Sequence, residues 1–596
     1  MPHSMLKKWL VLPPPPQDFF DAHPELPKIV SHLLYHRGLR TQKQIDEFLN
    51  PDYSEDIHDP FLFRDMTKAV ERIFFAMKKN ERITIYGDYD ADGVSGATIL
   101  TDGLKALGAT NLSVFLPHRE TDGYGVNMRA VDALKQEGTS LMITCDCGGS
   151  NTKEIAHANT LGIDVIVTDH HTLPEQLPPA YALIHPKAPG ETYPDQTLAG
   201  GGVAFKLVQA LFKKHKEANE TLPNGERHEA VEKWSLDMAA IASVADMVPL
   251  LGESRTLTKY GLIVLNKTRR IGLQKLLLEA RLMEQDGTLK KEISAETISF
   301  QLAPRINAAG RMNHASVAYN LMVTKDPLEA TDLAFELNKN NQDRQRLSEE
   351  LSKEATAQVA GETASILFAM GKGWPIGLVG LIAGKLKEKF QKPAIVMTTH
   401  ENEITGSGRS IDAFNMIGAF QSIPECFVKF GGHPMACGFT VENLEKAEEF
   451  KQKLLAEFAK QTNGVDVSPT LAIDADVRLD DVTWELYDVL EKFAPFGQAN
   501  PKPRYAAFGL TVVSLKSLGK DKRHLSLFAK HDAKIKKFIG WNLCNGSEEG
   551  CVDWSKEIKA GDTVDIVFEI SVNEWNGNRE LQLTIVDIKK SEQTID

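Results

Sequence analysis

The sequence predicts an α/β protein with two sheet-bearing domains, a long helix between them and a small C-terminal β-barrel. Short apolar runs alternate with helical stretches from about residue 80 to residue 250, which predicts a parallel sheet with crossover helices. The same alternation returns between residues 360 and 462. Closely spaced β-like runs after residue 465 predict the barrel.

The composition is that of an ordinary globular protein, with 42% hydrophobic and 25% charged residues. At roughly 150 residues per domain, the 596 residues are expected to form about three or four domains. A formal net charge of -13 argues against a protein that coats duplex DNA. A nucleic-acid enzyme needs only a locally basic channel, so the net charge leaves the partner open.

Cysteine usage and hydropathy indicate the compartment. Six cysteines without a dense framework are typical of a reducing compartment. Cys145 and Cys147 lack a second nearby pair that would complete a zinc site. The apolar run 9–12 is too short for a signal peptide, and no run approaches the ~18 apolar residues of a membrane helix. We therefore expect a cytoplasmic protein that does not contact a membrane.

The N-terminal lead-in, residues 1–75, is predicted to be partly helical, with an amphipathic helix over 41–49. The first sheet-bearing domain follows over 76–250, with apolar runs at 83–86, 112–116, 141–144, 165–168 and 181–184. Three of these runs end in possible ligands. Asp88, Asp90 and Asp92 follow the first run, Asp146 follows the third, and Asp169, His170 and His171 follow the fourth. Carboxyl ends of parallel strands meet at one edge of a sheet, where α/β folds place ligands.

Three crowded carboxylates repel one another unless a cation lies among them, and hard divalent cations prefer oxygen ligands. The alternatives at this point are a solvated acidic turn and a calcium loop. An EF-hand requires glutamate at the twelfth position, which Ile99 occupies when counting from Asp88. The pattern therefore favours a metal site.

A two-metal phosphodiesterase fits these residues. Two divalent ions roughly 3.5–4 Å apart hold an attacking hydroxide and stabilise the leaving oxygen of a phosphate ester. The candidate ligands are Asp88, Asp90, Asp92, Asp146, His170 and Asp246. Asp246 lies in the apolar segment 241–249, where an uncompensated carboxylate is costly; the alternative is a helix-end acid satisfied by backbone amides. His171 is a candidate phosphate contact or proton donor, and Asp169 a candidate for orienting a histidine.

Residues 251–359 are predicted to be a helical region with a connecting helix. A polar interruption is expected at 304–311. The run 327–359 is predicted to be the long connecting helix, and its polar residues are expected to be mostly solvated; they include Asn338, Asn341, Arg344 and Arg346.

The second sheet-bearing domain, 360–464, has expected strands at 365–370 and 394–397, and expected helices at 378–390 and 442–461. It also carries two polar motifs, 406–410 and 431–433. Residues 465–596 follow, with β-like runs at 510–515, 524–528, 535–541, 564–572 and 579–588. About five strands in this length suit a small barrel of the oligonucleotide-binding (OB) type.

The segments 87–93, 146–148, 169–171 and 245–250 resemble the motifs of the DHH phosphoesterase superfamily. Within it, the chain is similar to the bacterial exonucleases that degrade single-stranded DNA from its 5′ end. This resemblance runs from about residue 30 to the C-terminus. It includes 304–311, 406–410, 431–433 and 493–501.

The resemblance implies a DHH catalytic domain with two Mn²⁺ or Mg²⁺ ions, a DHH-associated domain across a cleft, and an OB-fold barrel that helps to encircle the strand. It implies the metal set given above, and it implies a catalytic set of Asp88, Asp90, Asp92, Asp146, His170 and His171. Arg409, with Ser407 and His433, is expected to hold backbone phosphate, because the planar guanidinium pairs with phosphate oxygens at two points. Arg305, Asn307 and Arg311 are weaker candidates for the same role; a hydrogen-bonded interdomain turn is the alternative.

The chain departs from the family pattern at three positions. Pro375 stands where many relatives have histidine, and Asn313 stands where aspartate is common. Tyr86 stands where the pyrophosphatase branch has a metal-binding histidine, and Asp88 is expected to compensate. None of these changes removes an expected metal ligand, so we expect an active enzyme.

The expected function is therefore a metal-dependent 5′→3′ exonuclease that hydrolyses single-stranded DNA in DNA repair and recombination. A channel narrow enough for one backbone excludes a duplex, and a barrel adds stacking surfaces for any base. The alternatives are a nuclease for short RNA or cyclic dinucleotides and a non-catalytic single-strand-binding scaffold. We expect a monomer, with a single-strand-binding protein and a helicase as candidate partners.

Overall fold

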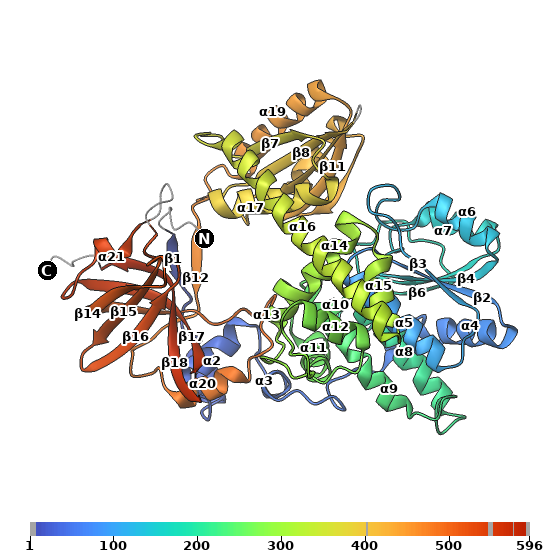
Figure 1. The fold of residues 1–596 in the computed structure, drawn as a ribbon, viewed down its shortest axis with the longest axis horizontal. Coiled ribbons are helices and arrows are strands. Elements are labelled where there is room, and N and C mark those ends of the chain that lie inside the picture. The colour runs from blue at the N-terminus through green and yellow to red at the C-terminus, as the bar shows by residue number, and fades with distance from the viewer. Residues whose placement is uncertain (1–6, 401–402, 546–551, 576, 592–596) are drawn as a thin grey trace. The chain divides into compact units, whose positions relative to one another are not determined.

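The computed structural model describes residues 7–400, 403–545, 552–575 and 577–591 (Figure 1). The chain forms two compact units. The first, called here the parallel-sheet unit, comprises Asp46–Leu347 and Pro495–Asn500. The second, called the barrel unit, comprises Met1–Ile45, Ser348–Ala494 and Pro501–Asp596.

The parallel-sheet unit is built on five parallel strands in the order β3-β2-β4-β5-β6. They are β2 (Arg82–Gly87), β3 (Leu112–Phe115), β4 (Thr139–Cys145), β5 (Asp164–Thr168) and β6 (Ala182–Ile184). All five predicted runs are confirmed as strands. Gly87 pairs with Cys145 and Cys145 pairs with Thr168, so β2, β4 and β5 end side by side.

Helices cover both faces of this sheet, which explains why its strands are apolar at nearly every position. Ile83 and Ile85 pack toward α4 (Met66–Lys79), α5 (Ala91–Ala106), α8 (Gly200–Lys216) and α10 (Leu236–Ala245). Val165 and Val167 pack on the opposite face, toward α6 (Met128–Gln136) and α7 (Thr152–Thr160). The remaining helices of the unit are α9 (His228–Trp234), α11 (Gly252–Leu265), α12 (Ile271–Glu279), α13 (Ala295–Thr297), α14 (Ala303–Met312), α15 (Ser316–Val323) and a turn at Pro60–Leu62. The predicted amphipathic helix is α3 (Gln42–Leu49).

The structure corrects the expectation of a polar interruption at 304–311. This segment is helix α14, and a π-helical turn, Ile298–Leu302, precedes it. Pro304 is the second residue after the π-helical turn, inside a continuous helical stretch over 295–312, and because it has no N–H it interrupts the helical hydrogen-bond ladder there.

The predicted connecting helix is confirmed as α16 (Pro327–Val359), which continues from the parallel-sheet unit into the barrel unit. Its polar residues are less solvated than expected. Asn338 and Asn341 are buried and Arg344 is half-buried, whereas Arg346 is exposed. The prediction that these residues are mostly solvated was wrong because other elements pack against that side of α16. The sequence of one helix does not reveal such packing.

The barrel unit contains a five-stranded mixed sheet in the order β10-β11-β9-β8-β7, in which only β7 and β8 are parallel. The strands are β7 (Leu367–Lys372), β8 (Ala394–His400), β9 (Glu403–Arg409), β10 (Lys429–His433) and β11 (Ala436–Val441). The accompanying helices are α17 (Ile376–Phe390), α18 (Met416–Ser422), a turn at Pro424–Cys426, and α19 (Leu444–Gln461). The two polar motifs of this region fall on β9 and β10.

The same unit contains a closed barrel. Its strands follow the order β14-β15-β16-β18-β17, and an additional β14–β17 pairing closes the circle. They are β14 (Tyr505–Leu518), β15 (His524–His531), β16 (Lys534–Gly540), β17 (Thr563–Trp575) and β18 (Asn578–Lys590). Five strands in a closed barrel confirm the OB-type prediction. Shorter elements are α1 (Gln17–Ala22), α2 (Lys28–His36), β13 (Ala475–Asp476), α20 (Trp484–Glu491), α21 (Trp554–Glu557) and the parallel pair β1 (Lys8–Val11) and β12 (Thr470–Ile473). Among the described residues, no helix is both long enough and apolar enough to span a membrane.

Candidate metal centre

The loop from β2 to α5 carries the first three predicted ligands. Asp88 follows the last residue of β2, and Asp90 caps α5 by accepting hydrogen bonds from the amides of Asp92 (2.9 Å) and Gly93 (3.1 Å). A Cβ atom on Gly93 would lie 2.6 Å from the backbone nitrogen and oxygen of Asp88. Only glycine permits so tight a transition from strand to helix at this position.

Asp92 is held at the N-terminus of α8. Its two carboxylate oxygens accept hydrogen bonds from the amides of Gly200 (2.8 Å) and Gly201 (2.6 Å). Unpaired amides at a helix N-terminus stabilise a negative charge. The Asp92 carboxylate is therefore fixed by the backbone, and it is almost fully buried.

Asp146, His170 and Asp246 complete the cluster. Asp146 follows β4 in a left-handed conformation with a φ of 62°. His170 Nε2 lies 3.3 Å from Asp146 Oδ1, 3.4 Å from Asp246 Oδ2 and 3.8 Å from Asp92 Oδ2. Asp246 is at the C-terminal cap of α10.

The structure brings the six predicted ligands together as two triads. One ligand atom from each of Asp88, Asp90 and Asp146 lies within 4.8 Å of the others, and the same holds for Asp92, His170 and Asp246. The short Asp146–His170 distance connects the triads. This grouping is what two neighbouring cations would require.

Several donor atoms of the cluster have no protein partner. Asp88 Oδ1, Asp146 Oδ1 and His170 Nε2 are buried and make no hydrogen bond within the described residues. Buried polar atoms are nearly always paired, so these atoms require an occupant of the cluster. Carboxylate oxygens with one imidazole and no thiolate are the donors that suit Mn²⁺ or Mg²⁺.

The electrostatics of the cluster agree with this assignment. Burial, reinforced by the neighbouring carboxylates, raises the pKa of Asp88 and Asp146 well above the ordinary range. The same causes raise the pKa of Asp92 to about 7 and that of Asp246 to about 8. Burial lowers the pKa of His170 to about 3, which leaves its ring neutral and able to coordinate a metal. Without a cation the buried acids retain protons, because ionising several neighbouring carboxylates is electrostatically costly. A bound divalent ion removes that cost.

His171 lies beside the cluster and differs from His170. Its Nδ1 is 2.9 Å from Asp169 Oδ1 and 2.9 Å from the Tyr124 hydroxyl. Burial disfavours the charged ring, but the hydrogen bond and charge of Asp169 outweigh burial and raise the pKa of His171 to about 9. Asp169 therefore orients His171, and it also accepts the amide of Gly149 at 2.8 Å.

Two neighbours of the cluster were missed by sequence reasoning. The Tyr124 hydroxyl donates to the Asp146 carbonyl at 3.3 Å, and the Arg119 guanidinium stacks over the Tyr89 ring at 3.9 Å. Both lie in the loop after β3, which contains no acidic strand end. The turn glycines Gly123 and Gly125, both with positive φ, were the available indication of a specific loop structure.

Helix α14 packs against the β2–α5 loop. Asn307 Oδ1 accepts the amide of Ala91 at 2.8 Å, and a Cβ on Gly310 would lie 2.6 Å from the Tyr89 carbonyl oxygen. Arg305 is directed to α16, where its Nε donates to Asn338 Oδ1 at 3.1 Å. Arg311 lies half-buried in the last turn of α14.

The remaining predicted site residues lie in the barrel unit, on strands β9 and β10, which flank β11. Arg409, on β9, donates from Nη1 to Ser407 Oγ and to the Gly408 carbonyl, both at 2.8 Å. Burial lowers the pKa of Arg409, and no carboxylate within the described residues forms an ion pair with it. His433 is exposed at the end of β10, and both it and Arg409 pair with Ala436 of β11.

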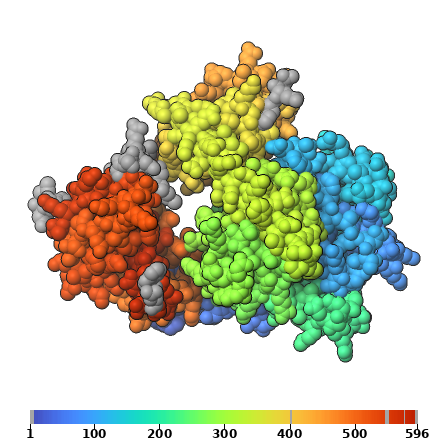
Figure 2. Space-filling model, viewed as in Figure 1, coloured from blue at the N-terminus to red at the C-terminus, as the bar shows by residue number. Residues whose placement is uncertain are grey.

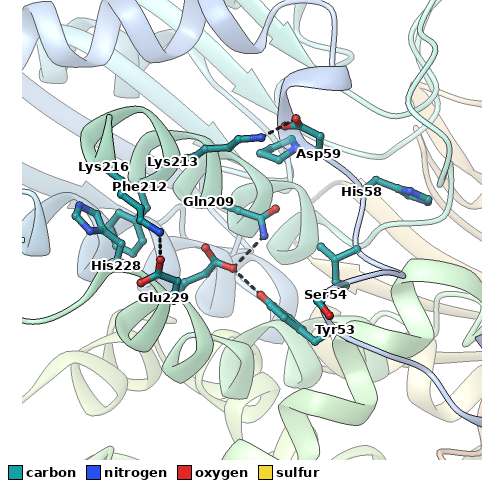
Figure 3. Close-up of a pocket in the computed structure, with 13 residues that line it drawn as sticks. Tyr53, Ser54, His58, Asp59, Gln209, Phe212, Lys213, Lys216, His228 and Glu229 are labelled. Carbon is teal, nitrogen blue, oxygen red and sulfur yellow. Dashed lines mark hydrogen bonds and ion pairs between the residues drawn. The ribbon is translucent and has the colours of Figure 1, made fainter. Parts of the chain in front are cut away.

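A cavity of about 350 Å³ lies elsewhere in the parallel-sheet unit, between α8, α9 and residues 53–60 (Figure 3). None of the predicted site residues lines it. Its lysines are neutralised, because Lys213 pairs with Asp59 at 2.6 Å and Lys216 pairs with Glu229. Glu232, a third acid of the lining, accepts hydrogen bonds from the Tyr53 hydroxyl at 2.7 Å and from Gln209 at 3.0 Å.

A carboxylate-rich centre at the edge of a parallel sheet, followed by a mixed sheet and a closed barrel, is the arrangement of the DHH class of proteins. Three family models match this chain: the DHH family N-terminal domain over residues 82–242, the DHHA1 domain over 363–460 and the RecJ OB domain over 473–587.

The chain belongs to the RecJ family. It is 36% identical to the single-stranded-DNA-specific exonuclease RecJ of Bacillus subtilis, over 95% of this chain and 68% of that protein. It is 31% identical to the Salmonella typhimurium exonuclease of the same name, over 95% of this chain and 96% of that protein. The crystal structure of Thermus thermophilus RecJ with Mn²⁺ matches with a TM-score of 0.80 and 27% identity, over 98% of this chain and 80% of that chain. The Mg²⁺ complex of the same protein matches with a TM-score of 0.74 and 26% identity, over 98% and 79% of the two chains.

Proposed function

We propose that this protein is a metal-dependent exonuclease that hydrolyses the phosphodiester bonds of single-stranded DNA from the 5′ end. One observation carries the chemistry: six ligands form two adjacent triads whose innermost atoms, Asp88 Oδ1, Asp146 Oδ1 and His170 Nε2, have no protein partner. Membership of the RecJ family supplies the substrate class, since its named members act on single-stranded DNA.

The cofactors are two divalent cations, Mn²⁺ or Mg²⁺. Asp88, Asp90 and Asp146 would hold one ion and Asp92, His170 and Asp246 the other, with Asp146 between them. Ions bound there activate water and neutralise charge on the phosphate. The chain supplies a fixed ligand set, because backbone amides of α8 and the cap of α5 already orient two of the carboxylates.

His171 is assigned a catalytic role that differs from metal binding. Asp169 keeps its ring charged near neutral pH, and its Nδ1 lies 3.7 Å from Asp146 Oδ1. A charged imidazole at this position can hold a proton for the leaving oxygen or contact the phosphate.

We assign Ser407, Arg409 and His433 to the binding of backbone phosphate. Arg409 supports this role because it is half-buried and, among the described residues, donates hydrogen bonds only to the neutral groups of Ser407 and Gly408. Arg311 and Arg305 remain candidates for contacts to the same strand. Asn307 is better suited to supporting the metal loop, since its side-chain oxygen already accepts the Ala91 amide.

We further propose that the enzyme acts as a cytoplasmic monomer in DNA repair and recombination, alongside a single-strand-binding protein and a helicase. The five described cysteines are free, which supports a reducing compartment. As domain bounds we propose 76–250, 360–464 and 465–596, each of which contains one matched family segment.

The test uses 5′-labelled and 3′-labelled single-stranded DNA with a duplex control, incubated with Mn²⁺, with Mg²⁺ or with chelator. We expect immediate release of small labelled products from the 5′ end in either metal and none with chelator. Asp146→Asn should reduce turnover by at least about 10²-fold, because Asp146 is the ligand that connects the two triads.

Other outcomes would select the alternatives. Cleavage confined to very short RNA or cyclic dinucleotides would identify a nuclease for those substrates. Binding without turnover by folded, metal-loaded protein would identify a scaffold. First release of label from the 3′ end would overturn the proposed polarity.

A further inference from the structure

Among the described residues, no carboxylate forms an ion pair with Arg344 of helix α16. Its guanidinium is half-buried, and its one hydrogen bond goes from Nη2 to Asn341 Oδ1 at 2.9 Å. Its Nε is buried and has no partner within the described residues. Burial alone lowers the pKa of Arg344, with no carboxylate acting against it.

A second unpaired donor lies one helical turn away. Asn340 precedes Arg344 by four residues, so the two side chains lie on the same stripe of α16. The Asn340 Nδ2 atom is also buried without a partner. Buried donors are nearly always hydrogen-bonded, so two such donors on one stripe of α16 without an acceptor among the described residues point to an external acceptor.

Arg305 adds positive charge from the facing helix α14. Arg305 contacts α16 through Asn338. Burial lowers the pKa of Arg305, the charge of Glu279 raises it, and the charge of Arg344 lowers it further. Arg305 lies on the same helix as Asn307 and Gly310, which pack against the metal loop. The Arg344 cluster is thus linked to the metal centre by one rigid element.

Two other buried cations of the parallel-sheet unit are paired with acids. Arg270 pairs with Asp102 and Asp237, and Lys206 pairs with Glu253. Arg344 differs from these two, because no acid forms an ion pair with it among the described residues.

Helix α16 lies on the face of the parallel-sheet unit that is turned to the viewer in Figure 2. Arg344 is half-buried there, and its neighbours Gln345 and Arg346 are exposed. A half-buried guanidinium on a partly exposed helix surface can pair with a phosphate group of a ligand.

We infer that Arg344, with Asn340 and Arg305, forms a phosphate-binding site for a nucleotide of the DNA substrate away from the scissile bond. The ligand class is a phosphodiester, because the guanidinium fork matches two phosphate oxygens and the amide of Asn340 adds a third donor. This inference rests on the proposed exonuclease function and names a part of its substrate-binding surface.

The test compares Arg344→Gln with Arg346→Gln. Arg346 is on the same helix two residues later, is exposed, and forms an ion pair with Asp343 at 3.1 Å, so it is a matched control outside the site. Each variant is assayed with Mn²⁺ on a long single strand and on the p-nitrophenyl ester of thymidine 5′-phosphate, which carries only the scissile phosphodiester.

For Arg344→Gln we expect KM for the long strand to rise about tenfold with kcat and ester hydrolysis within about twofold of wild type. The slope of log(kcat/KM) against the logarithm of salt concentration is negative, and it should become less negative by about 0.7, the value for one contact to a single-strand phosphate. Arg346→Gln should resemble wild type in both assays. The proposed phosphate site would be wrong if the two variants changed KM and the salt slope equally. It would also be wrong if Arg344→Gln reduced ester hydrolysis as much as cleavage of the long strand.

A second variant guards against a folding defect. Asn340→Asp places a carboxylate one turn from Arg344, which should preserve or raise thermal stability while raising KM for the long strand. A stable Asn340→Asp protein with unchanged KM and salt slope would count against the site.

Fluorescence anisotropy of labelled single-stranded DNA, measured in chelator, separates this inference from the proposed function. If wild type binds the strand and Arg344→Gln weakens binding, the site stands even where no cleavage occurs. If wild type cleaves the strand and Arg344→Gln binds it as tightly as wild type, the exonuclease stands and the site falls.

Discussion

At the scale of single residues, Asp92 and Asp246 make the stability of the metal-free protein depend on pH. Their pKa values of about 7 and 8 exceed the ordinary 3.8, so the folded protein retains protons that the unfolded chain has lost. Stability should therefore fall as pH rises toward 8. His171, with a pKa raised to about 9, acts in the same direction above pH 6.5. His170 has the opposite tendency, but only below its ordinary value of 6.5.

Between pH 6.5 and 8, the change in stability with pH therefore comes mainly from the groups with raised pKa values, Asp92, Asp246 and His171. Asp92, Asp246 and His171 together retain roughly two more protons than the unfolded chain across this window, so the free energy of unfolding of the metal-free protein should drop by about 4 kcal/mol. Urea titrations in chelator measure this drop. Saturating Mn²⁺ should flatten the dependence, since the cation replaces the protons.

Asp246→Asn is the informative variant. It should unfold less readily than wild type at pH 8 in chelator, because one of the repelling charges is gone, and it should gain less stability from Mn²⁺. A wild-type protein more stable at pH 8 than at pH 6.5 in chelator would contradict the assignment of the cluster.

Which site residues could be predicted from the sequence follows from their position in the chain. Asp88, Asp146 and His170 each follow an apolar run directly, and parallel strands bring such positions together. Tyr124 and Arg119 escaped because their partners, His171 and Tyr89, lie 47 and 30 residues away along the chain, and only tertiary packing joins them. Local sequence contains no trace of such pairings.

At the scale of secondary-structure elements, α14 is the support of the metal loop. Gly310→Ala would place a Cβ 2.6 Å from the Tyr89 carbonyl, a backbone atom that cannot move away without shifting Asp88 and Asp90. We expect a loss of about 1–3 kcal/mol in the free energy of unfolding and weaker Mn²⁺ binding, measured by calorimetric titration.

Gly384→Ala is the matched control for that substitution. Gly384 is also inside a helix, α17, and a Cβ there meets nothing within 4 Å. Alanine should stabilise that helix by up to about 1 kcal/mol and leave Mn²⁺ affinity unchanged. Equal stability changes for the two variants would show that α14 does not constrain the loop.

Strands were easier to predict than α14 for a physical reason. A strand buried on both faces produces a continuous apolar run that flanking polar residues delimit, whereas 304–311 combines a proline with two arginines and an asparagine. Two of those polar residues are explained by tertiary contacts: Arg305 donates to Asn338, and Asn307 accepts the amide of Ala91. A helix whose polar side faces other elements resembles a loop in sequence.

At the scale of the whole molecule, the two units should respond differently to the metal. All six ligands belong to the parallel-sheet unit, which contains 46–347 and 495–500. Ligand at 100 times its Kd stabilises the unit that binds it by about 2.7 kcal/mol, which slows exchange through opening of that unit by about 100-fold. Of the residues that the structure describes, those forming the two triads all lie in the parallel-sheet unit.

Hydrogen exchange read by mass spectrometry, with and without Mn²⁺, tests this difference. We expect increased protection in α5, α8 and α10 and little change in strands β14–β18 of the barrel. Helix α16 is the sensitive probe, because the boundary between the units falls within it, between Leu347 and Ser348. Protection that stops near this boundary would show that the units open independently. Protection that spreads uniformly through α16 into β7 and β8 would contradict that independence and would show that the connecting helix transmits metal binding to the second unit.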